Sequence, residues 1–494
     1  MRVSELFGLT GSQGSFDFID VDVEHDTPLF IDPSALATLQ SPWANSCISS
    51  IQSFFQAVLD KIRAKDSFGA MALLRELGEV NATHLGYSSV SQGSGVGDGL
   101  AEKFYDELAN SDAVASGFVT DLEDTALLVE GVREDRISDV TTNIIREQLV
   151  EYTQATAEFY EIPTQDGLAI GPFWNARVNA WEQATATLPL TKQGPLLLVP
   201  KSIVRRNLYY NPGEYYRHYV LEYFKQQELD SMSPLVYLLK KGPHKGEPRV
   251  KKGDVENKYR QQFGAGRHNP GVEKRINLHA TQQNPDLLLQ FKSDKAETPP
   301  RPTGHEAIAD ATGVDAPWLH LNDLLKAVTD LAPGQADATA YERAVEALLA
   351  ALFYPDLVNP VRQRRLHDGR KIIDISYTNV AAKDTFFYWL ATHYPAANVV
   401  VECKNYSKPL GNKEYDQLAG RFSPSRGRYG LLVYRKVEGK DAFLESCRDT
   451  AKDDRGFITP LDDDDLAQLV QEAQEGGCAQ IGGLLHQRFE FLTS

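Results

Sequence analysis

Two acidic side chains stand inside apolar, strand-like runs in the last third of the chain. Asp374 interrupts the run 371–375, and Glu402 follows the valines of the run 398–404. A carboxylate is costly to bury unless it is paired or binds a metal ion, so two of them invite a shared cation. Carboxylate oxygens are hard ligands that suit Mg²⁺ or Mn²⁺. The two runs therefore predict a metal site.

Lys404 stands two positions after Glu402, so both side chains are expected on the same face of a strand. An amine beside a metal-binding carboxylate can orient an attacking water or offset charge on a scissile phosphate. A metal-bound water is a usable nucleophile near neutral pH. These residues predict metal-dependent hydrolysis of a phosphodiester bond, with the side chain of Cys403 on the opposite face, in the core.

The order Glu342, Asp374, Glu402, Lys404 resembles the restriction-endonuclease-like PD-(D/E)xK nuclease superfamily, and the phrase VECKNY is similar to the strand of its Mrr-like branch. The resemblance covers about 150 residues at the C-terminal end. It implies an Mg²⁺-dependent endonuclease, usually acting on DNA, in which Asp374 and Glu402 hold the metal ion. Lys404 would then serve the attacking water and the phosphate.

The resemblance also implies supporting residues. Glu342, in a Tyr-Glu-x-x-Val pattern, matches the helical glutamate that often completes the metal site, and Glu346, one turn later, competes with it. Gln417 resembles a glutamine that some members place near the same site. The chain departs from the simplest members in that 28 positions separate Asp374 from Glu402, and no proline precedes Asp374.

The elements that must position these residues predict an α/β domain over residues 335–494, a mixed central sheet with flanking helices. An Asp-Gly pair at 368–369 lies between two extended runs, as is typical of a hairpin. The expected order is αββαβαβαβα. The expected strands are 361–366, 371–377, 398–404, 429–434 and 456–461, and the expected helices are 341–353, 384–393, 413–421, 442–451 and one that begins at 462–465.

Residues 1–292 predict a larger, helix-rich α+β module of unidentified fold, which would recognise a target or regulate the nuclease. Residues 293–334 read as a linker followed by a helix. Inside the module, alternating apolar and acidic residues at 15–32 predict one or two strands. Amphipathic spacing predicts helices over 133–160 and 173–187.

Charge is distributed unevenly along a chain whose net charge is −17. Residues 1–200 hold 11 Lys/Arg against 29 Asp/Glu, a balance of −18, whereas residues 201–280 hold 16 against 8, a balance of +8. Local charge decides where a polyanion docks more than the total does. The basic segment 201–280 is therefore a candidate binding face.

Nine cations of this segment, separated by tyrosines, are the candidate nucleic-acid contacts. Cations bind phosphates and aromatic rings stack on bases. The alternative is a solvated basic face whose tyrosines pack into the core from a helix over 214–224. The candidates are Lys201, Arg205, Arg206, Lys240, Lys241, Lys245, Arg249, Lys251 and Lys252.

Two weaker patterns occur in the N-terminal module. The glycine-rich loop 93–99 precedes a helix and could cradle a phosphate, although a turn is the better interpretation. Asp135, Asp139 and Asn143 share one helix face, which favours an exposed or hydrogen-bonded surface over a second catalytic site.

The chain has no apolar run long enough to span a bilayer and no secretory signal at its N-terminus, so we expect a cytoplasmic protein. The expected function is a metal-dependent nuclease acting on double-stranded DNA, in restriction or antiviral defence, gated by the N-terminal module, a partner protein or a ligand. One alternative is a nuclease that cleaves RNA, including tRNA. The other is a non-catalytic nucleic-acid sensor with a nuclease-like fold.

Overall fold

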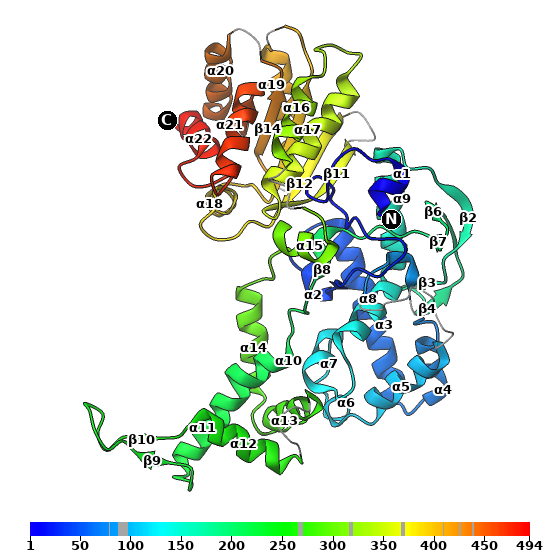
Figure 1. Ribbon diagram of the computed structural model, residues 1–494, viewed down its shortest axis with the longest axis vertical. Helices are drawn as coiled ribbons and strands as arrows, with labels where there is room; N and C mark the ends of the chain where they lie inside the picture. Colours follow the sequence, from blue (N-terminus) through cyan, green and yellow to red (C-terminus); the bar gives the residue numbers. More distant parts are fainter. Residues whose placement is uncertain are drawn as a thin grey trace.

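The computed structural model describes residues 1–78, 80–86, 97–264, 270–315, 320–366, 371–408, 410–423, 426–436 and 439–494. The molecule is elongated. A five-stranded sheet and its helices lie at one end of the long axis, and a hairpin of two short strands, β9 (Tyr237–Leu238) and β10 (Pro248–Arg249), projects at the other (Figure 1). No helix within the described ranges is both long and apolar enough to cross a membrane.

The large sheet is mixed, as the sequence predicts, and its strands follow the chain order β11-β12-β13-β14-β15. The first three strands pair antiparallel and the last three pair parallel. Every residue of β14 is buried, which explains its continuous apolar sequence, since a parallel strand is covered on both faces. The strands are β11 (Leu357–Leu366), β12 (Lys371–Asn379), β13 (Asn398–Lys404), β14 (Tyr429–Tyr434) and β15 (Phe457–Leu461).

Helices cover both faces of this sheet. Val399 and Val401 of β13 join the core that includes α17, whereas Val400 joins a smaller core with α19 and α20, as alternation along a strand requires. The expected order of elements is found, with one further helix, α22, at the end. The helices are α16 (Leu321–Thr329), α17 (Ala338–Phe353), α18 (Phe386–His393), α19 (Asn412–Ala419), α20 (Lys440–Lys452), α21 (Asp463–Gln474) and α22 (Leu484–Thr493).

The N-terminal module has its own core, which gathers buried residues from Val3 to Ile308 together with Tyr354 and Val358. Its longest helix, α3, begins at Pro42 behind a Ser41 side chain that accepts a hydrogen bond from the Ala44 amide. The helices of this module are α1 (Val3–Phe7), α2 (Pro33–Leu36), α3 (Pro42–Arg63), α4 (Ser67–Leu74), α5 (Gly97–Ala109), α6 (Asp112–Ala115), α7 (Leu122–Leu128), α8 (Glu134–Ile144), α9 (Arg146–Tyr160), α10 (Pro212–Tyr215), α11 (Leu221–Asp230), α12 (Lys252–Gln262), α13 (Pro270–Gln283), α14 (Asp286–Glu297) and α15 (His305–Thr312).

The helix predicted over 173–187 is wrong. This segment forms the short strands β3 (Phe173–Asn175), β4 (Ala180–Glu182) and β5 (Thr185–Leu188). Trp174 and Trp181 pair across the β3–β4 hairpin with ring centroids 5.4 Å apart, and a cross-strand aromatic pair stabilises a hairpin.

Two other expectations for this module hold only in part. The helix expected over 133–160 is interrupted at Ile145, between α8 and α9. Of the strands expected at 15–32, only β1 (Phe30–Ile31) forms, paired with β8 (Val204–Arg205).

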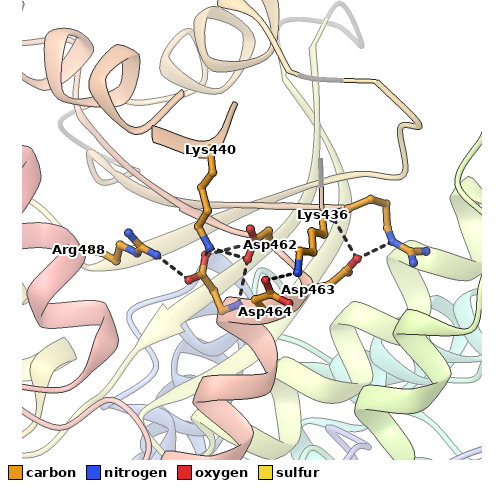
Figure 2. Close-up of polar contacts among 8 residues, drawn as sticks. Lys436, Lys440, Asp462, Asp463, Asp464 and Arg488 are labelled. Carbon is orange, nitrogen blue, oxygen red and sulfur yellow. Dashed lines mark hydrogen bonds and ion pairs between the residues drawn. The ribbon is translucent and has the colours of Figure 1, made fainter. Parts of the chain in front are cut away.

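The acidic start of α21 is neutralised by side chains from other elements (Figure 2). Lys440 of α20 reaches Asp462 at 2.7 Å and Asp465 at 2.8 Å, and Arg488 of α22 reaches Asp465 at 2.7 Å. The exposed pair Lys436–Asp464 lies beside them. The run therefore caps a helix and joins it to α20 and α22, and each of these carboxylates has a cationic partner.

The two modules meet at a buried group of charged and aromatic residues, which we call the Arg362 cluster. Arg362 of β11 lies 2.8 Å from Asp17 of the N-terminal module and donates to Glu346 of α17 at 2.6 Å. Tyr152 donates to the other oxygen of Asp17, and the guanidinium lies 4.2 Å from the ring centre of Phe159. All three charged side chains are at most 9% exposed, so the cluster is shielded from solvent.

Candidate active site

Asp374 and Glu402 lie on neighbouring antiparallel strands. The pairing of β12 with β13 runs to Ile375 opposite Val401, and Asp374 and Glu402 are the next residue of each strand at that end. The Asp374 carboxylate accepts a hydrogen bond of 2.9 Å from the Cys403 amide. The structure thus brings together the two acids that the sequence singles out.

Both oxygens of the Glu402 carboxylate have cationic partners. Lys404 donates to one oxygen at 2.6 Å, and Arg421 donates to the other. Glu402 is 1% exposed and Arg421 is 4% exposed, so these contacts are screened little by water. The sequence interpretation missed Arg421. Its one signal was an arginine at the end of the helix expected over 413–421.

Burial, and after it the neighbouring Glu402 carboxylate, raise the pKa of Asp374, and the net value is about 6. The Cys403 amide and the cations Lys404 and Arg421 act in the opposite direction. Burial alone would lower the pKa of Lys404, but the attraction of Glu402 outweighs it, so the pKa of Lys404 is raised. Near neutral pH the site holds a protonated lysine beside two carboxylates, one of which is close to its titration point.

Glu342 contributes to the same electrostatic environment from α17. Burial raises the pKa of the Cys403 thiol, and the carboxylates of Asp374, Glu342 and Glu402 raise it further, in that order. Cys403 packs against the core that contains α17, as expected for its position in the strand. The three predicted metal ligands thus all act on the electrostatics of the Cys403 thiol, which itself faces the core.

Glu346, the alternative to Glu342, belongs to the Arg362 cluster. Its carboxylate accepts a hydrogen bond of 2.6 Å from Arg362 and is 1% exposed. Glu342 lies one turn earlier and is half-buried. Of the two glutamates that the sequence left open, Glu346 is thus committed to an ion pair away from Asp374.

Gln417 does not join the site in the way the resemblance implies. It is exposed on α19, and no contact among the described residues links it to Asp374, Glu402 or Lys404. Arg421, four residues later, points its guanidinium at Glu402 instead. The helix is where the sequence predicts it, but the side chain that reaches Glu402 comes from the residue after its C-cap, Gly420.

The donor set suits a hard divalent cation, although the three predicted ligands are not gathered into a closed cage. Among the described residues, Asp22, Glu24 and His25 at the surface are the one group of three whose ligand atoms lie within 4.8 Å of one another. At Asp374, two carboxylates face each other and one has a raised pKa. A cation between them would reverse that repulsion.

The structure corrects two of the candidate nucleic-acid contacts. Lys201 is 3% exposed and donates to the Gly14 carbonyl at 3.0 Å, with its amine 4.1 Å from the ring centre of Tyr354. Arg205 is 8% exposed and donates to the carbonyls of Ser202 and Val204. Because both cationic groups are buried and hydrogen-bonded inside the protein, neither is available to a phosphate.

The tyrosines between the two groups of cations also pack inward in part. Tyr215 and Tyr216 are at most 1% exposed, and Tyr215 shares a hydrogen bond of 2.8 Å with Thr281. These two rings therefore pack into the core and are not available to stack on bases.

Most of the other candidate cations lie at the surface and several have acidic partners. Arg206 pairs with Asp310 at 3.5 Å, Arg249 with Glu247 at 2.8 Å and Lys252 with Glu222 at 3.0 Å. The remaining candidates are exposed, and no ion pair among the described residues includes them. They are Lys240, Lys241, Lys245 and Lys251.

The weaker patterns give no second site. Asn143 is fully buried and donates to the carbonyls of Gly78 and Asp139, while Asp135 is exposed, so this helix face is structural. The loop at 93–99 lies mostly outside the described residues, which resume at Gly97 with α5.

Comparison with known proteins bears on the N-terminal module alone. Residues 8–211 match the model of DUF8370, a domain of unknown function. No curated protein and no solved structure matches the chain. The matched segment ends well before β11, so the function of the C-terminal domain is argued from its geometry.

Proposed function

We propose that the C-terminal domain is a metal-dependent endonuclease with a restriction-endonuclease-like, PD-(D/E)xK fold. The observation that carries the proposal is the meeting of Asp374, Glu402 and Lys404 at the ends of β12 and β13. A fully buried and a half-buried carboxylate beside a protonated amine are costly to a folded protein, and such costs concentrate at functional sites. The mixed sheet between two helical layers supports the same proposal.

In this proposal Asp374 and Glu402 hold Mg²⁺ or Mn²⁺, and Glu342 completes the set because Glu346 is bound to Arg362. The metal ion supplies an activated water near neutral pH. Lys404 stays protonated and offers its charge to the water and to the scissile phosphate. Arg421 fixes the orientation of Glu402 by holding its second oxygen.

Double-stranded DNA is the substrate we propose, with RNA as the alternative. We place the enzyme in restriction or antiviral defence, with cutting gated by the N-terminal module. The contact that supports gating is the Arg362 cluster, because Arg362 pairs with Ile375, the neighbour of Asp374, and also binds α17.

A second candidate function is a nucleic-acid sensor that binds without cutting. One observation favours it. Lys404 and Arg421 already occupy both oxygens of Glu402, so the carboxylate is neutralised without a metal ion. Each oxygen keeps a second lone pair that can bind a metal ion, so an enzyme would add the ion to these contacts, whereas a sensor has no need of it.

The deciding experiment is cleavage of supercoiled plasmid by the purified full chain with Mg²⁺ or Mn²⁺. Lys404→Ala is the test variant, and Lys408→Ala, four residues later and exposed, is the matched control. We expect the wild type and the control to nick or linearise the plasmid, and Lys404→Ala to lose at least about 100-fold in rate. If the wild type binds plasmid and RNA but cleaves neither, the nuclease proposal is rejected in favour of the nucleic-acid sensor.

A further inference from the structure

The hairpin β9–β10 is an ordered ribbon that projects from the N-terminal module, at the end of the molecule opposite the five-stranded sheet (Figure 1). Its two strands pair Tyr237 with Arg249 and Leu238 with Pro248. Two further backbone hydrogen bonds, from the Leu239 amide to the Glu247 carbonyl and from the Gly246 amide to the Leu239 carbonyl, close it above residues 240–245. The tip is thus a defined structure.

The ribbon carries a concentrated positive charge that the protein itself does not neutralise. Residues 237–249 contain four Lys/Arg and one acid, Glu247. Glu247 pairs with His244 and Arg249. Lys240, Lys241 and Lys245 are exposed, and no ion pair within the described residues includes any of them. In a chain with 68 Asp/Glu and 51 Lys/Arg, these three lysines at one protruding tip form a local positive charge that can attract a polyanion.

The base of the ribbon is anchored. The helices on either side of it, α11 and α12, are joined by stacked rings of Phe224 and Tyr259, whose centroids are 3.7 Å apart. The buried Glu228 accepts hydrogen bonds from Lys258 and from the Tyr259 hydroxyl. A ribbon held in this way loses little conformational entropy when it meets a partner.

We propose that the ribbon, residues 237–249, is an arm that grips the backbone of duplex DNA through Lys240, Lys241 and Lys245. The proposal rests on the nuclease function above and deepens it by naming the surface that holds the substrate. A two-stranded β-ribbon fits the major groove of B-DNA, and lysines bind phosphates on its walls. The exposed side chains of Tyr237 (43%) and Leu238 (54%) add an apolar surface behind the tip.

The arm and β12, the strand that carries Asp374, lie toward opposite ends of the long axis (Figure 1). A duplex that touches both must run along the molecule, so the arm holds DNA away from the cutting point. This geometry predicts that long duplexes bind more tightly than short ones, and that the gain depends on the three lysines.

The test measures binding of a fluorescent 40-base-pair duplex to the full chain carrying Lys404→Ala, in Ca²⁺, at salt concentrations from about 50 to 200 mM. The arm variant is Lys240→Gln/Lys241→Gln/Lys245→Gln. The matched control removes three exposed lysines elsewhere on the N-terminal module, Lys65→Gln/Lys103→Gln/Lys192→Gln.

We expect the arm variant to bind at least about tenfold more weakly than the control, and the slope of log affinity against log salt to fall by about 2 to 3, since each phosphate contact contributes about 0.9. Equal affinity and slope in the two variants overturn the proposal, as does a parent chain that binds no duplex. Loss of self-association in light scattering, with duplex affinity unchanged, would assign the arm to a second copy of the chain and also overturn it. Tight arm-dependent binding without cleavage by the wild type would leave the arm standing and remove the nuclease function alone.

Discussion

At the residue scale, Asp374 combines two unfavourable conditions. It is half-buried, and it faces the buried carboxylate of Glu402, so its pKa rises to about 6. A residue chosen for stability alone would be neutral at this position. This repulsion between Asp374 and Glu402 has a use if the position binds a cation. The repulsion destabilises the metal-free protein and is relieved when a metal ion binds.

Asp374→Asn should therefore stabilise the protein in the absence of divalent ions. A carboxyl whose pKa is raised on folding stabilises the folded state below its unfolded pKa, near 4, and that contribution is lost as pH rises through about 6. We expect the free energy of unfolding to increase by about 2 kcal/mol at pH 8 and by about half as much at pH 5, where the folded carboxyl is already mostly protonated. Urea denaturation at both pH values in EDTA measures the difference.

Asparagine keeps an oxygen that can accept the hydrogen bond from Cys403, so a loss of that contact does not confuse the result. Destabilisation at pH 8, or an equal effect at both pH values, would contradict the account of the site. The same variant should lose metal-dependent cleavage. One substitution would then raise stability and abolish activity.

At the element scale, the acidic cap of α21 shows how a helix start can tie three elements together. Burial alone would raise the pKa of Asp465, but Lys440, Arg488 and the Asp462 amide outweigh it, so the pKa is lowered. The carboxylate is 3% exposed and serves both as capping partner and as ion-pair partner.

Asp465→Asn should destabilise the C-terminal domain by about 3 kcal/mol at pH 7, because it leaves Arg488 without its buried partner and Lys440 with Asp462 alone. A carboxyl whose pKa is lowered on folding contributes its stability above its unfolded pKa, near 4, and loses it as pH falls, so the effect should shrink at pH 3. Thermal unfolding at pH 7 and pH 3 gives both values. Asp464→Asn, in the same turn but with a 60% exposed side chain, is the control and should change stability by less than about 1 kcal/mol.

The elements also show what sequence alone could predict. The strands β13 and β14 were predictable because runs such as NVVVECK and YGLLVY leave few alternatives to a buried strand. The segment 173–187 was not, because its aromatic residues fit the spacing of an amphipathic helix and only the pairing of Trp174 with Trp181 decides for strands. Propensity and periodicity are local, whereas that pairing is tertiary.

The residues of the candidate site also fall into those that sequence could predict and those that depend on tertiary contacts. Asp374, Glu402 and Lys404 could be found because charged residues at the end of an apolar strand are conspicuous in one dimension. Arg421 could not be assigned, because nothing local tells a helix-end arginine to reach a carboxylate on a strand. Lys201 and Arg205 were misread for the same reason, since charge counts along a sequence carry no information about burial.

At the scale of the whole molecule, the Arg362 cluster is the contact through which one module can influence the other. Asp17 comes from the N-terminal module, and Arg362 and Glu346 come from the strand and the helix that support the candidate site. Removing one charge from such a buried group costs about 3 to 5 kcal/mol.

Asp17→Ala should uncouple the two modules. We expect calorimetry to show two separated unfolding transitions in place of one, and the rate of plasmid cleavage to change by at least about threefold, because Arg362 is then balanced by Glu346 alone. The control is Glu161→Gln, which removes an exposed ion pair with Arg343 of α17 and should alter neither measurement. A single transition with unchanged cleavage would show that the cluster does not couple the modules.

The division of the two cores has a practical consequence for anyone who dissects this protein or compares its architecture with others. Ile308 of α15 belongs to the N-terminal core, whereas Leu321, Leu324 and Val328 of α16 belong to the C-terminal one. The natural seam therefore falls between Gly313 and His320, and not at residue 335, where the composition of the sequence changes. A cut at that seam would leave Tyr354 and Val358, which complete the N-terminal core, on the C-terminal piece, so we expect the two halves to fold best as one chain.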